Sequence, residues 1–225
     1  MAELIFEPLL FWGIIIKKEG YMKKGLFITF EGADGCGKTT QLNLLAQYLE
    51  QNGYNVIKTR EPGAKGLGEK FREILLNYDG EVSDRCESFL FLADRAQHVD
   101  MIIKPAVESG KIVLCDRHTD STVAYQGYGR GLDINQIKRL NDIATNGLKP
   151  DMTFIFDVDI ETSNKRVGKE KDRMESAGDD FFTKVRNGYL QIAKEEPNRI
   201  KVIDSTRSID EVFEDVKMYI KNALK

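Results

Sequence analysis

The 225-residue chain has few of the residues that build disulfide frameworks or metal centres. Its three cysteines, Cys36, Cys86 and Cys115, are odd in number and far apart, which excludes a disulfide framework and a CxxC metal pair. Its two histidines, His98 and His118, are too few for a zinc site built on imidazole. This sparse use of cysteine indicates a reducing compartment, and we expect the protein to be cytoplasmic.

Neither an excess of one charge nor a membrane-spanning run occurs in the sequence. The chain has 33 Lys and Arg against 36 Asp and Glu, a net charge of −3, which disfavours non-specific nucleic-acid binding. The mostly apolar run at residues 9–16 is too short to span a membrane. With 41% apolar and 31% charged residues, the chain is typical of a globular domain, so neither nucleic acid nor membrane is an expected partner.

Residues 1–21 differ in character from the rest of the chain. Their apolar run follows acidic residues and precedes two lysines, the reverse of the charge order of a signal peptide. Met22 stands just before the first predicted strand and offers a plausible start. We therefore predict a non-essential extension at 1–21 and a single domain at 22–225. The alternative is a short apolar helix that docks on the body or on a partner subunit.

From residue 26 onward, strand-like and helix-like segments alternate. Five β-rich runs predict strands at 26–31, 55–59, 112–115, 152–158 and 200–203. Helical spacing predicts helices at 39–51, 68–77, 84–108, 119–127, 133–145, 161–167, 180–194 and 209–221. Pro105 should kink the third helix, and capping boxes are predicted at Asp84–Glu87 and Ser208–Glu211. The alternation predicts an α/β fold with a parallel five-stranded sheet, helices on both faces, and ligands at the carboxyl ends of the strands.

One motif dominates the sequence, a G-x-x-x-x-G-K-T phosphate loop (P-loop) between the first predicted strand and the first predicted helix. The predicted ATP-binding residues are Gly32, Ala33, Asp34, Gly35, Cys36, Gly37, Lys38, Thr39 and Thr40. Glycines let the backbone wrap a phosphate with its N–H groups inward, and the helix N-terminus adds partial positive charge. Lys38 can reach the β- and γ-phosphates, and the Thr39 hydroxyl can bind Mg²⁺.

Two missing signatures narrow the class of nucleotide-binding protein. The N-K-x-D guanine clamp of signalling GTPases does not occur, and neither does the L-S-G-G-Q signature of transporter ATPases. The remaining small P-loop class consists of kinases that act on nucleosides, nucleotides or small metabolites.

Three further segments carry side chains suited to a second ligand. Asp116 and Arg117 follow a predicted buried strand, where they can position Mg²⁺ and clamp a phosphate. Phe91 and Arg95 lie four residues apart on one face of a predicted helix, and residues 121–127 offer hydroxyls and an amide. Each has an ordinary alternative: Phe91 as core, Arg95 as a surface charge, and Asp116 as a strand-end residue.

In order and spacing over residues 23–225, the chain resembles the thymidylate kinase family. The resemblance rests on F-E-G-A-D-G-C-G-K-T-T at 30–40, R-E-P-G at 60–63, F-x-A-x-R at 91–95, D-R-H at 116–118 and A-Y-Q-G at 124–127. It implies a P-loop kinase fold, a homodimer, and ATP-dependent phosphorylation of dTMP to dTDP. The transfer is expected to be direct and Mg²⁺-assisted, without a general base, because the acceptor is already an anion.

The resemblance also implies roles in binding the base and sugar of dTMP. Phe91 is expected to stack on thymine, and Arg95 to donate to its O4. Tyr125 is expected to crowd the position of a 2′-hydroxyl, and Asp34 to accept from the 3′-hydroxyl. The residues expected near the base edge are Ser121, Thr122 and Gln126.

For the phosphates, the resemblance implies that Arg60 and Arg117 hold the 5′-phosphate of dTMP. Lys38, Mg²⁺ and Arg117 are expected to compensate the charge that develops during transfer. The metal ligands are expected to be Thr39 and Asp116.

A lid loop is implied at about residues 168–178. Family members take a further cation from either the phosphate loop or the lid, and Gly35 stands where the first group has arginine. The chain therefore resembles the second group, with Arg173, Arg166 and Lys169 as catalytic candidates. The lid is about two residues short, and Lys169 stands where arginine is expected. The alternative is a solvated loop of mixed charge.

Two other functions stay open at this point. A deoxynucleoside kinase would phosphorylate a hydroxyl and would need a carboxylate base. A P-loop nucleotide sensor would bind ATP without turnover, although it would have no use for a thymine pocket.

Overall fold

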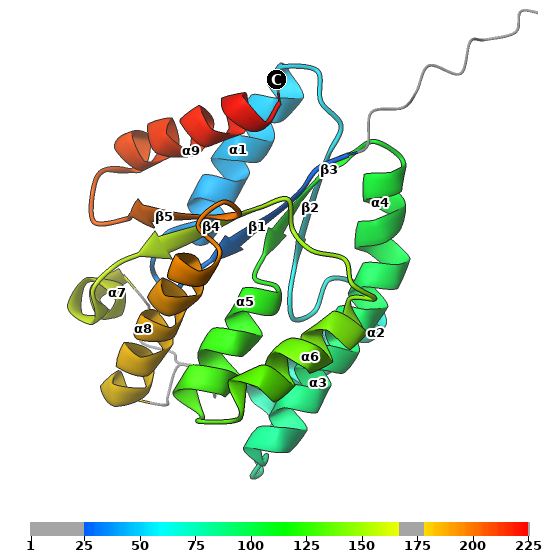
Figure 1. Ribbon diagram of the computed structural model, residues 1–225, viewed down its shortest axis with the longest axis vertical. Helices are drawn as coiled ribbons and strands as arrows, with labels where there is room; N and C mark the ends of the chain where they lie inside the picture. Colours follow the sequence, from blue (N-terminus) through cyan, green and yellow to red (C-terminus); the bar gives the residue numbers. More distant parts are fainter. Residues whose placement is uncertain (1–24, 167–177, 225) are drawn as a thin grey trace, which may run out of the picture.

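The computed structural model describes residues 25–166 and 178–224. The predicted extension at 1–21 and nearly all of the predicted lid loop therefore lie outside the described residues. Five parallel strands form one sheet in the order β2-β3-β1-β4-β5, with helices on both faces (Figure 1). The strands are β1 (Phe27–Glu31), β2 (Val56–Arg60), β3 (Ile112–Asp116), β4 (Met152–Asp157) and β5 (Ile200–Asp204). The predicted fold class is thus confirmed.

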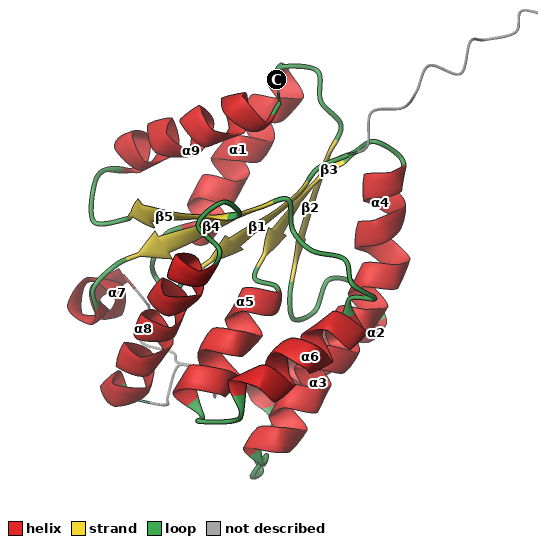
Figure 2. Ribbon diagram, in the orientation of Figure 1, coloured by secondary structure: helices red, strands yellow, loops and turns green. Residues whose placement is uncertain are grey.

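The helices alternate with these strands along the chain (Figure 2). Their bounds are α1 (Lys38–Gln51), α2 (Leu67–Asn77), α3 (Asp84–His98), α4 (Lys104–Glu108), α5 (Thr119–Thr122), α6 (Ile134–Ala144), α7 (Ile160–Arg166), α8 (Asp179–Glu195) and α9 (Ile209–Ala223). Two π-helical segments, η1 (Val99–Ile103) and η2 (Val123–Gly129), continue α3 and α5. Among the described helices, none has the length and apolar character needed to cross a bilayer.

Side chains that alternate along the strands build a core on each face of the sheet. On one face, Phe30 and Phe154 pack with apolar residues of α1 and α9. On the other face, Phe27 packs with η1 and α4, and Ile155 packs with η2 and α8. Both faces are covered, as expected for a parallel sheet whose central strands β1, β3 and β4 are mostly apolar and buried.

The parallel order brings the predicted functional segments to one edge. β1 lies between β3 and β4, with Phe30 paired to Asp116 on one side and to Phe154 on the other. Because all five strands run the same way, the phosphate loop after β1 meets the segment after β3 at their carboxyl ends.

The capping box predicted at the start of the third helix is wrong. Ser83 is the N-cap, and its hydroxyl accepts from the backbone N–H of Cys86, so Asp84 and Glu87 form no capping box. Glu87 points inward, fully buried, where Gln126 donates to its carboxylate at 3.0 Å. The box predicted at Ser208 and Glu211 is confirmed.

The predicted single helix at 84–108 is divided by η1. Pro105 lies in the first turn of α4, directly after the π-helical segment. Proline has no N–H for the carbonyl four residues earlier, so the hydrogen-bond ladder changes register there. The helix predicted at 119–127 likewise continues as η2 to residue 129.

Candidate functional site

A cavity of about 1120 Å³ lies at the edge where the strands end. The site residues predicted from the sequence that line this cavity are Asp34, Gly35, Gly37, Lys38, Thr39, Thr40, Arg60, Phe91, Arg95, Asp116, Arg117, Ser121, Thr122, Tyr125, Gln126 and Arg166. Three phosphate-loop positions, Gly32, Ala33 and Cys36, do not line it. The lid candidates Lys169 and Arg173 lie outside the described residues. One cavity therefore gathers the donor-side and acceptor-side residues that the sequence predicts.

The phosphate loop has the backbone that its glycines allow. Gly32 has φ 136°, and a Cβ there would lie 2.6 Å from the carbonyl oxygen of Phe156. Gly37, at φ 91°, precedes α1. An L-residue with a side chain would be strained at either position, so glycine is required for the loop to close beneath a phosphate.

The first residues of α1 link the loop to its neighbours. Lys38 Nζ donates to the carbonyl of Ala33 at 2.8 Å and lies 3.8 Å from Asp34 Oδ1. Thr39 Oγ1 donates to Asp116 Oδ2 at 2.8 Å. This pair presents a hydroxyl and a carboxylate oxygen to the cavity, the ligand chemistry that Mg²⁺ prefers.

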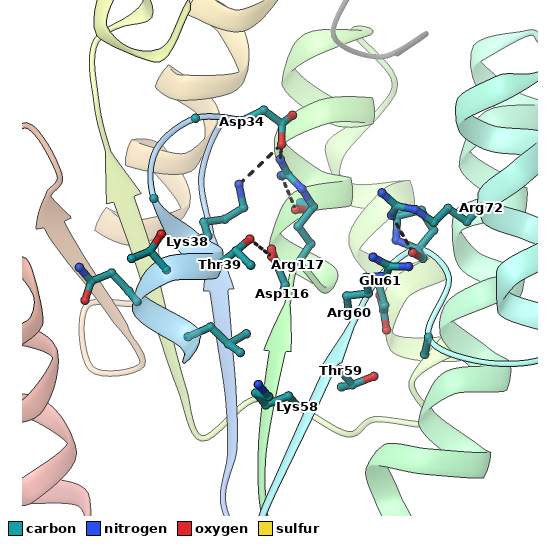
Figure 3. A pocket seen from close by; sticks show the side chains of 18 of the residues that line it. Asp34, Lys38, Thr39, Lys58, Thr59, Arg60, Glu61, Arg72, Asp116 and Arg117 are labelled. Atoms are coloured by element: carbon teal, nitrogen blue, oxygen red, sulfur yellow. Dashed lines mark hydrogen bonds and ion pairs between the residues drawn. The ribbon is translucent and has the colours of Figure 1, made fainter. Parts of the chain in front are cut away.

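Arg117 stands between the phosphate loop and the rest of the cavity (Figure 3). Its NH2 group donates to Asp34 Oδ1 at 2.6 Å, and its NH1 group donates to the carbonyl of Gly32 at 2.9 Å. Burial acts to raise the pKa of Asp34, but the charges of Arg117 and Lys38 outweigh it and lower that pKa to about 2. Asp34 is therefore ionised throughout the neutral range.

Two further arginines line the cavity beyond Arg117 (Figure 3). Arg60, at the end of β2, donates to the carbonyl of Gly63 at 3.4 Å. Arg72 of α2 donates to the carbonyl of Pro62 at 3.0 Å. Gly63 has φ 91°, and a Cβ there would lie 2.6 Å from Arg72 Cβ, so the loop passes tightly against this side chain. Sequence reasoning missed Arg72, because nothing in a lone arginine on a predicted helix distinguishes it from a surface charge.

Arg95 is almost completely buried, at 1% exposure, which excludes the surface-charge alternative. Its Nε donates to Glu61 at 2.9 Å, and its NH2 group donates to the carbonyl of His118 at 2.9 Å. The NH1 group donates to Thr122 at 2.8 Å and to Asn141 at 2.6 Å. These bonds engage four of the five N–H groups of the guanidinium and fix its plane at the cavity wall.

Phe91 is half-buried and lines the same part of the cavity, so it is not simply a core residue. Tyr125 also lines it, with the Arg117 guanidinium 5.1 Å from its ring centroid. Within the described residues, the buried Tyr125 hydroxyl has no hydrogen-bond partner. A ring face, a fixed guanidinium and a tyrosine together suit a planar, partly polar ligand.

Behind Arg95 lies a buried network that sequence reasoning missed. Glu61 Oε1 contacts His98 Nδ1 at 2.9 Å and His118 Nδ1 at 2.8 Å, and Thr59 Oγ1 contacts His98 Nε2 at 2.7 Å. Burial lowers the pKa of His118, so this ring is a neutral donor. Burial would raise the pKa of Glu61, but the hydrogen bonds from His118 and His98 and the charge of Arg95 hold it well below its usual range.

Glu61, His98 and Cys115 also lie close enough together to suggest a metal site. The donor atoms are instead engaged in hydrogen bonds: the ring nitrogens of His98 contact Glu61 and Thr59, and Cys115 is a buried thiol. That thiol donates to the carbonyl of Arg117 at 3.1 Å. Glu61 and His98 thus belong to the hydrogen-bond network behind Arg95, and Cys115 bonds to the backbone of Arg117.

The cavity extends past the phosphate loop to the segment after β5. Its additional lining residues there are Ser205, Arg207, Ser208, Ile209 and Val212. Arg166, the last residue of α7, donates to the carbonyl of Ser205 at 3.0 Å, and the Ser205 hydroxyl donates to the carbonyl of Cys36. The position of this segment at a strand's carboxyl end was the sequence signal that could have identified it.

Comparison with known proteins gives one result throughout. A family model described as thymidylate kinase matches residues 30–216. The chain is similar to a thymidylate kinase of Maridesulfovibrio salexigens, with 45% identity over 210 residues, 89% of this chain and 97% of that one. It is 50% identical over 189 residues to a thymidylate kinase of Sulfurihydrogenibium, covering 84% and 93% of the two chains. The crystal structure of thymidylate kinase from Ehrlichia chaffeensis superposes with a TM-score of 0.74, at 41% identity, over 88% of this chain and 99% of that one.

Proposed function

Since the chain belongs to the thymidylate kinase family, we propose how its cavity carries out the ATP-dependent phosphorylation of dTMP to dTDP. The observation that carries the proposal is the arrangement along one cavity. Figure 3 shows Arg117 between the phosphate loop and Arg60 and Arg72. Phe91, Arg95 and the segment after β5 line the same cavity. Two nucleotides bound end to end would bring their phosphates together at Arg117.

At the donor end, the phosphate loop holds the phosphates of ATP through its backbone N–H groups and Lys38. The segment after β5 encloses the nucleoside of ATP, since it continues the cavity beyond the loop. Thr39 and Asp116 hold Mg²⁺, which when bound neutralises charge on the transferred phosphate.

At the acceptor end, Arg117, Arg60 and Arg72 bind the 5′-phosphate of dTMP, and Phe91 stacks on thymine. The remaining N–H of Arg95 donates to the thymine O4, and Tyr125 crowds a 2′-hydroxyl. Asp34 accepts from the 3′-hydroxyl. Ser121, Thr122 and Gln126 lie at the base edge.

The transfer itself is direct. The acceptor oxygen belongs to a phosphate and needs no base, so catalysis consists of alignment and charge compensation. Lys38 and Arg117 supply cations on the two sides of the transferred group. Because Gly35 has no side chain to add a third cation, we assign that role to Arg166 and to the lid residues Lys169 and Arg173.

A steady-state assay of ADP formation with dTMP, thymidine, dUMP and dGMP tests this function. We expect turnover with dTMP and none with thymidine, because the arginines at the acceptor end recognise a phosphate. Phosphorylation of thymidine would instead support a deoxynucleoside kinase. ATP binding without ADP formation from any acceptor would support a sensor.

We also propose that the protein is a homodimer in which α3 packs on its copy. Phe89 and Met101 are 53% and 66% exposed and belong to one row along α3 and η1. The row consists of Cys86, Phe89, Ala93, Gln97 and Met101, spaced three or four residues apart. Apolar side chains in a row on an exposed helix face are typical of an interaction surface.

Phe89→Glu should therefore convert the protein to a monomer, because a charge within this row would be buried without a partner. Sedimentation velocity should show half the parent mass. Met218→Glu is the matched control: Met218 is 51% exposed on α9, across the sheet, and this variant should keep the parent mass. A dimeric Phe89→Glu protein would contradict the proposed interface.

Two proposals concern the chain beyond the site. We propose a cytoplasmic location, in keeping with the three free cysteines. The segment at 1–21 is proposed to be non-essential to the kinase domain at 22–225, so a chain that begins at Met22 should keep the parent kinetics.

A further inference from the structure

Behind Arg117 lies a polar cluster formed by Glu31, Ser121 and Tyr189. Glu31 is the last residue of β1, Ser121 belongs to α5, and Tyr189 belongs to α8. Glu31 and Tyr189 are buried, with 0% and 2% exposure, and neither lines the cavity. Their polar groups therefore face the protein interior and serve another residue.

The carboxylate of Glu31 collects three donors. Ser121 Oγ donates to Glu31 Oε2 at 2.5 Å, Tyr189 Oη donates to the same oxygen at 3.1 Å, and the two hydroxyls lie 2.8 Å apart. The backbone N–H of His118 donates to Glu31 Oε1 at 2.7 Å. Burial raises the pKa of Glu31 to about 7, and above that pH its ionised carboxylate accepts only, so the two hydroxyls direct their protons within the cluster, toward Glu31 or toward each other.

This orientation turns the hydroxyl lone pairs toward Arg117. The NH1 group of Arg117 donates to Ser121 Oγ at 3.3 Å and to Tyr189 Oη at 3.4 Å. A glutamine in place of Glu31 would bring an amide donor to the cluster. One hydroxyl would then accept from that amide and turn its own proton toward the guanidinium.

The backbone of Arg117 also depends on this cluster. Arg117 has φ 67°, a left-handed conformation that is strained for a non-glycine residue. Its N–H donates to the carbonyl of Phe30, and the following N–H, of His118, donates to Glu31. Glu31 thus contacts the strained backbone on one side and orients the groups behind the guanidinium on the other.

We propose that Glu31 and Tyr189 are positioning residues that hold Arg117 where it binds the phosphate of the acceptor nucleotide. The inference rests on the proposed role of Arg117. It adds that phosphate recognition depends on two residues outside the cavity, one of them on α8.

The test compares the affinities of dTMP and of thymidine, which lacks the phosphate, by isothermal titration calorimetry. Tyr189→Phe removes one hydrogen bond to the guanidinium and should weaken dTMP binding ~2–10-fold. Glu31→Gln should weaken it further, since it disturbs both the hydroxyls and the backbone. Thymidine affinity should change much less than dTMP affinity in both variants, because thymidine lacks the phosphate that Arg117 is proposed to bind.

Two reference variants make the outcomes distinct. Tyr128→Phe changes a half-buried tyrosine beside α8 and should leave both affinities unchanged. Arg117→Ala should abolish the preference for dTMP over thymidine. The positioning role is wrong if Arg117→Ala abolishes this preference while Tyr189→Phe keeps it or weakens the binding of both ligands equally. If Arg117→Ala keeps the preference, the proposed role of Arg117 is itself wrong.

Discussion

Replacing Lys38 with alanine should lower the turnover number for dTMP ~10²–10³-fold, the usual cost of losing one preorganised donor to developing charge. The Lys38 ammonium is held within the phosphate loop by the carbonyl of Ala33 and lies 3.8 Å from Asp34. It therefore acts on the donor phosphates and has no contact with the base pocket. The dissociation constant of dTMP, measured by calorimetry, should stay near the parent value.

Lys201→Ala provides the matched control for this variant. Lys201 lies on β5 and donates to the carbonyl of Pro197 at 2.7 Å, outside the cavity lining. Its loss should leave turnover unchanged. If the turnover number of Lys38→Ala stays within about twofold of the parent value, Lys38 does not compensate charge in the transition state.

Replacing Glu61 with glutamine should lower the free energy of unfolding by about 3–5 kcal/mol, the cost of breaking a buried ion pair from one side. Glu61 and Arg95 are both nearly fully buried, and Arg95 Nε donates to Glu61 at 2.9 Å. Glutamine keeps the shape but removes the charge and presents an amide to three donors. Urea denaturation at fixed protein concentration measures the loss.

Glu195→Gln is the surface control, because Glu195 pairs with Lys138 in an ion pair about two-fifths exposed on each side. Such pairs contribute about 0–1 kcal/mol. The pKa of Glu61 is held below its usual range, so its contribution is complete above about pH 4.5 and is lost as pH falls through the folded-state pKa. The parent should therefore lose stability more steeply in acid than Glu61→Gln. Parallel acid profiles would contradict this role for Glu61.

Much of the fold could be predicted from local pattern. The apolar strands, the glycines of the phosphate loop and the Ser208 cap each depend on neighbours within a few residues. The error at Glu87 shows the limit of that information. Its D-x-x-E spacing suits a cap, but a side chain 39 residues later draws the carboxylate into the interior.

The same limit explains which site residues sequence reasoning missed. Glu61 acquires its role from Arg95, 34 residues away, and Tyr189 acquires its role from Glu31, 158 residues away. Glu61 lies in the R-E-P-G segment, but nothing local indicates its pairing with Arg95, and Tyr189 does not stand out in type or spacing. By contrast, Lys38 and Asp116 could be predicted because a local motif or a strand end already implies their surroundings.

The position of Asp34 has a consequence for selectivity among anions. A single oxygen of this carboxylate lies 2.6 Å from Arg117 and 3.8 Å from Lys38, so one negative charge is shared by the donor-side and acceptor-side cations. Because the pKa of Asp34 is about 2, this internal counter-ion is present at every physiological pH. A free anion such as inorganic phosphate must compete with it and has no other contacts to offset that competition. A nucleotide overcomes the same competition with its base and sugar, so the counter-ion makes recognition of the whole molecule a condition for binding its phosphate.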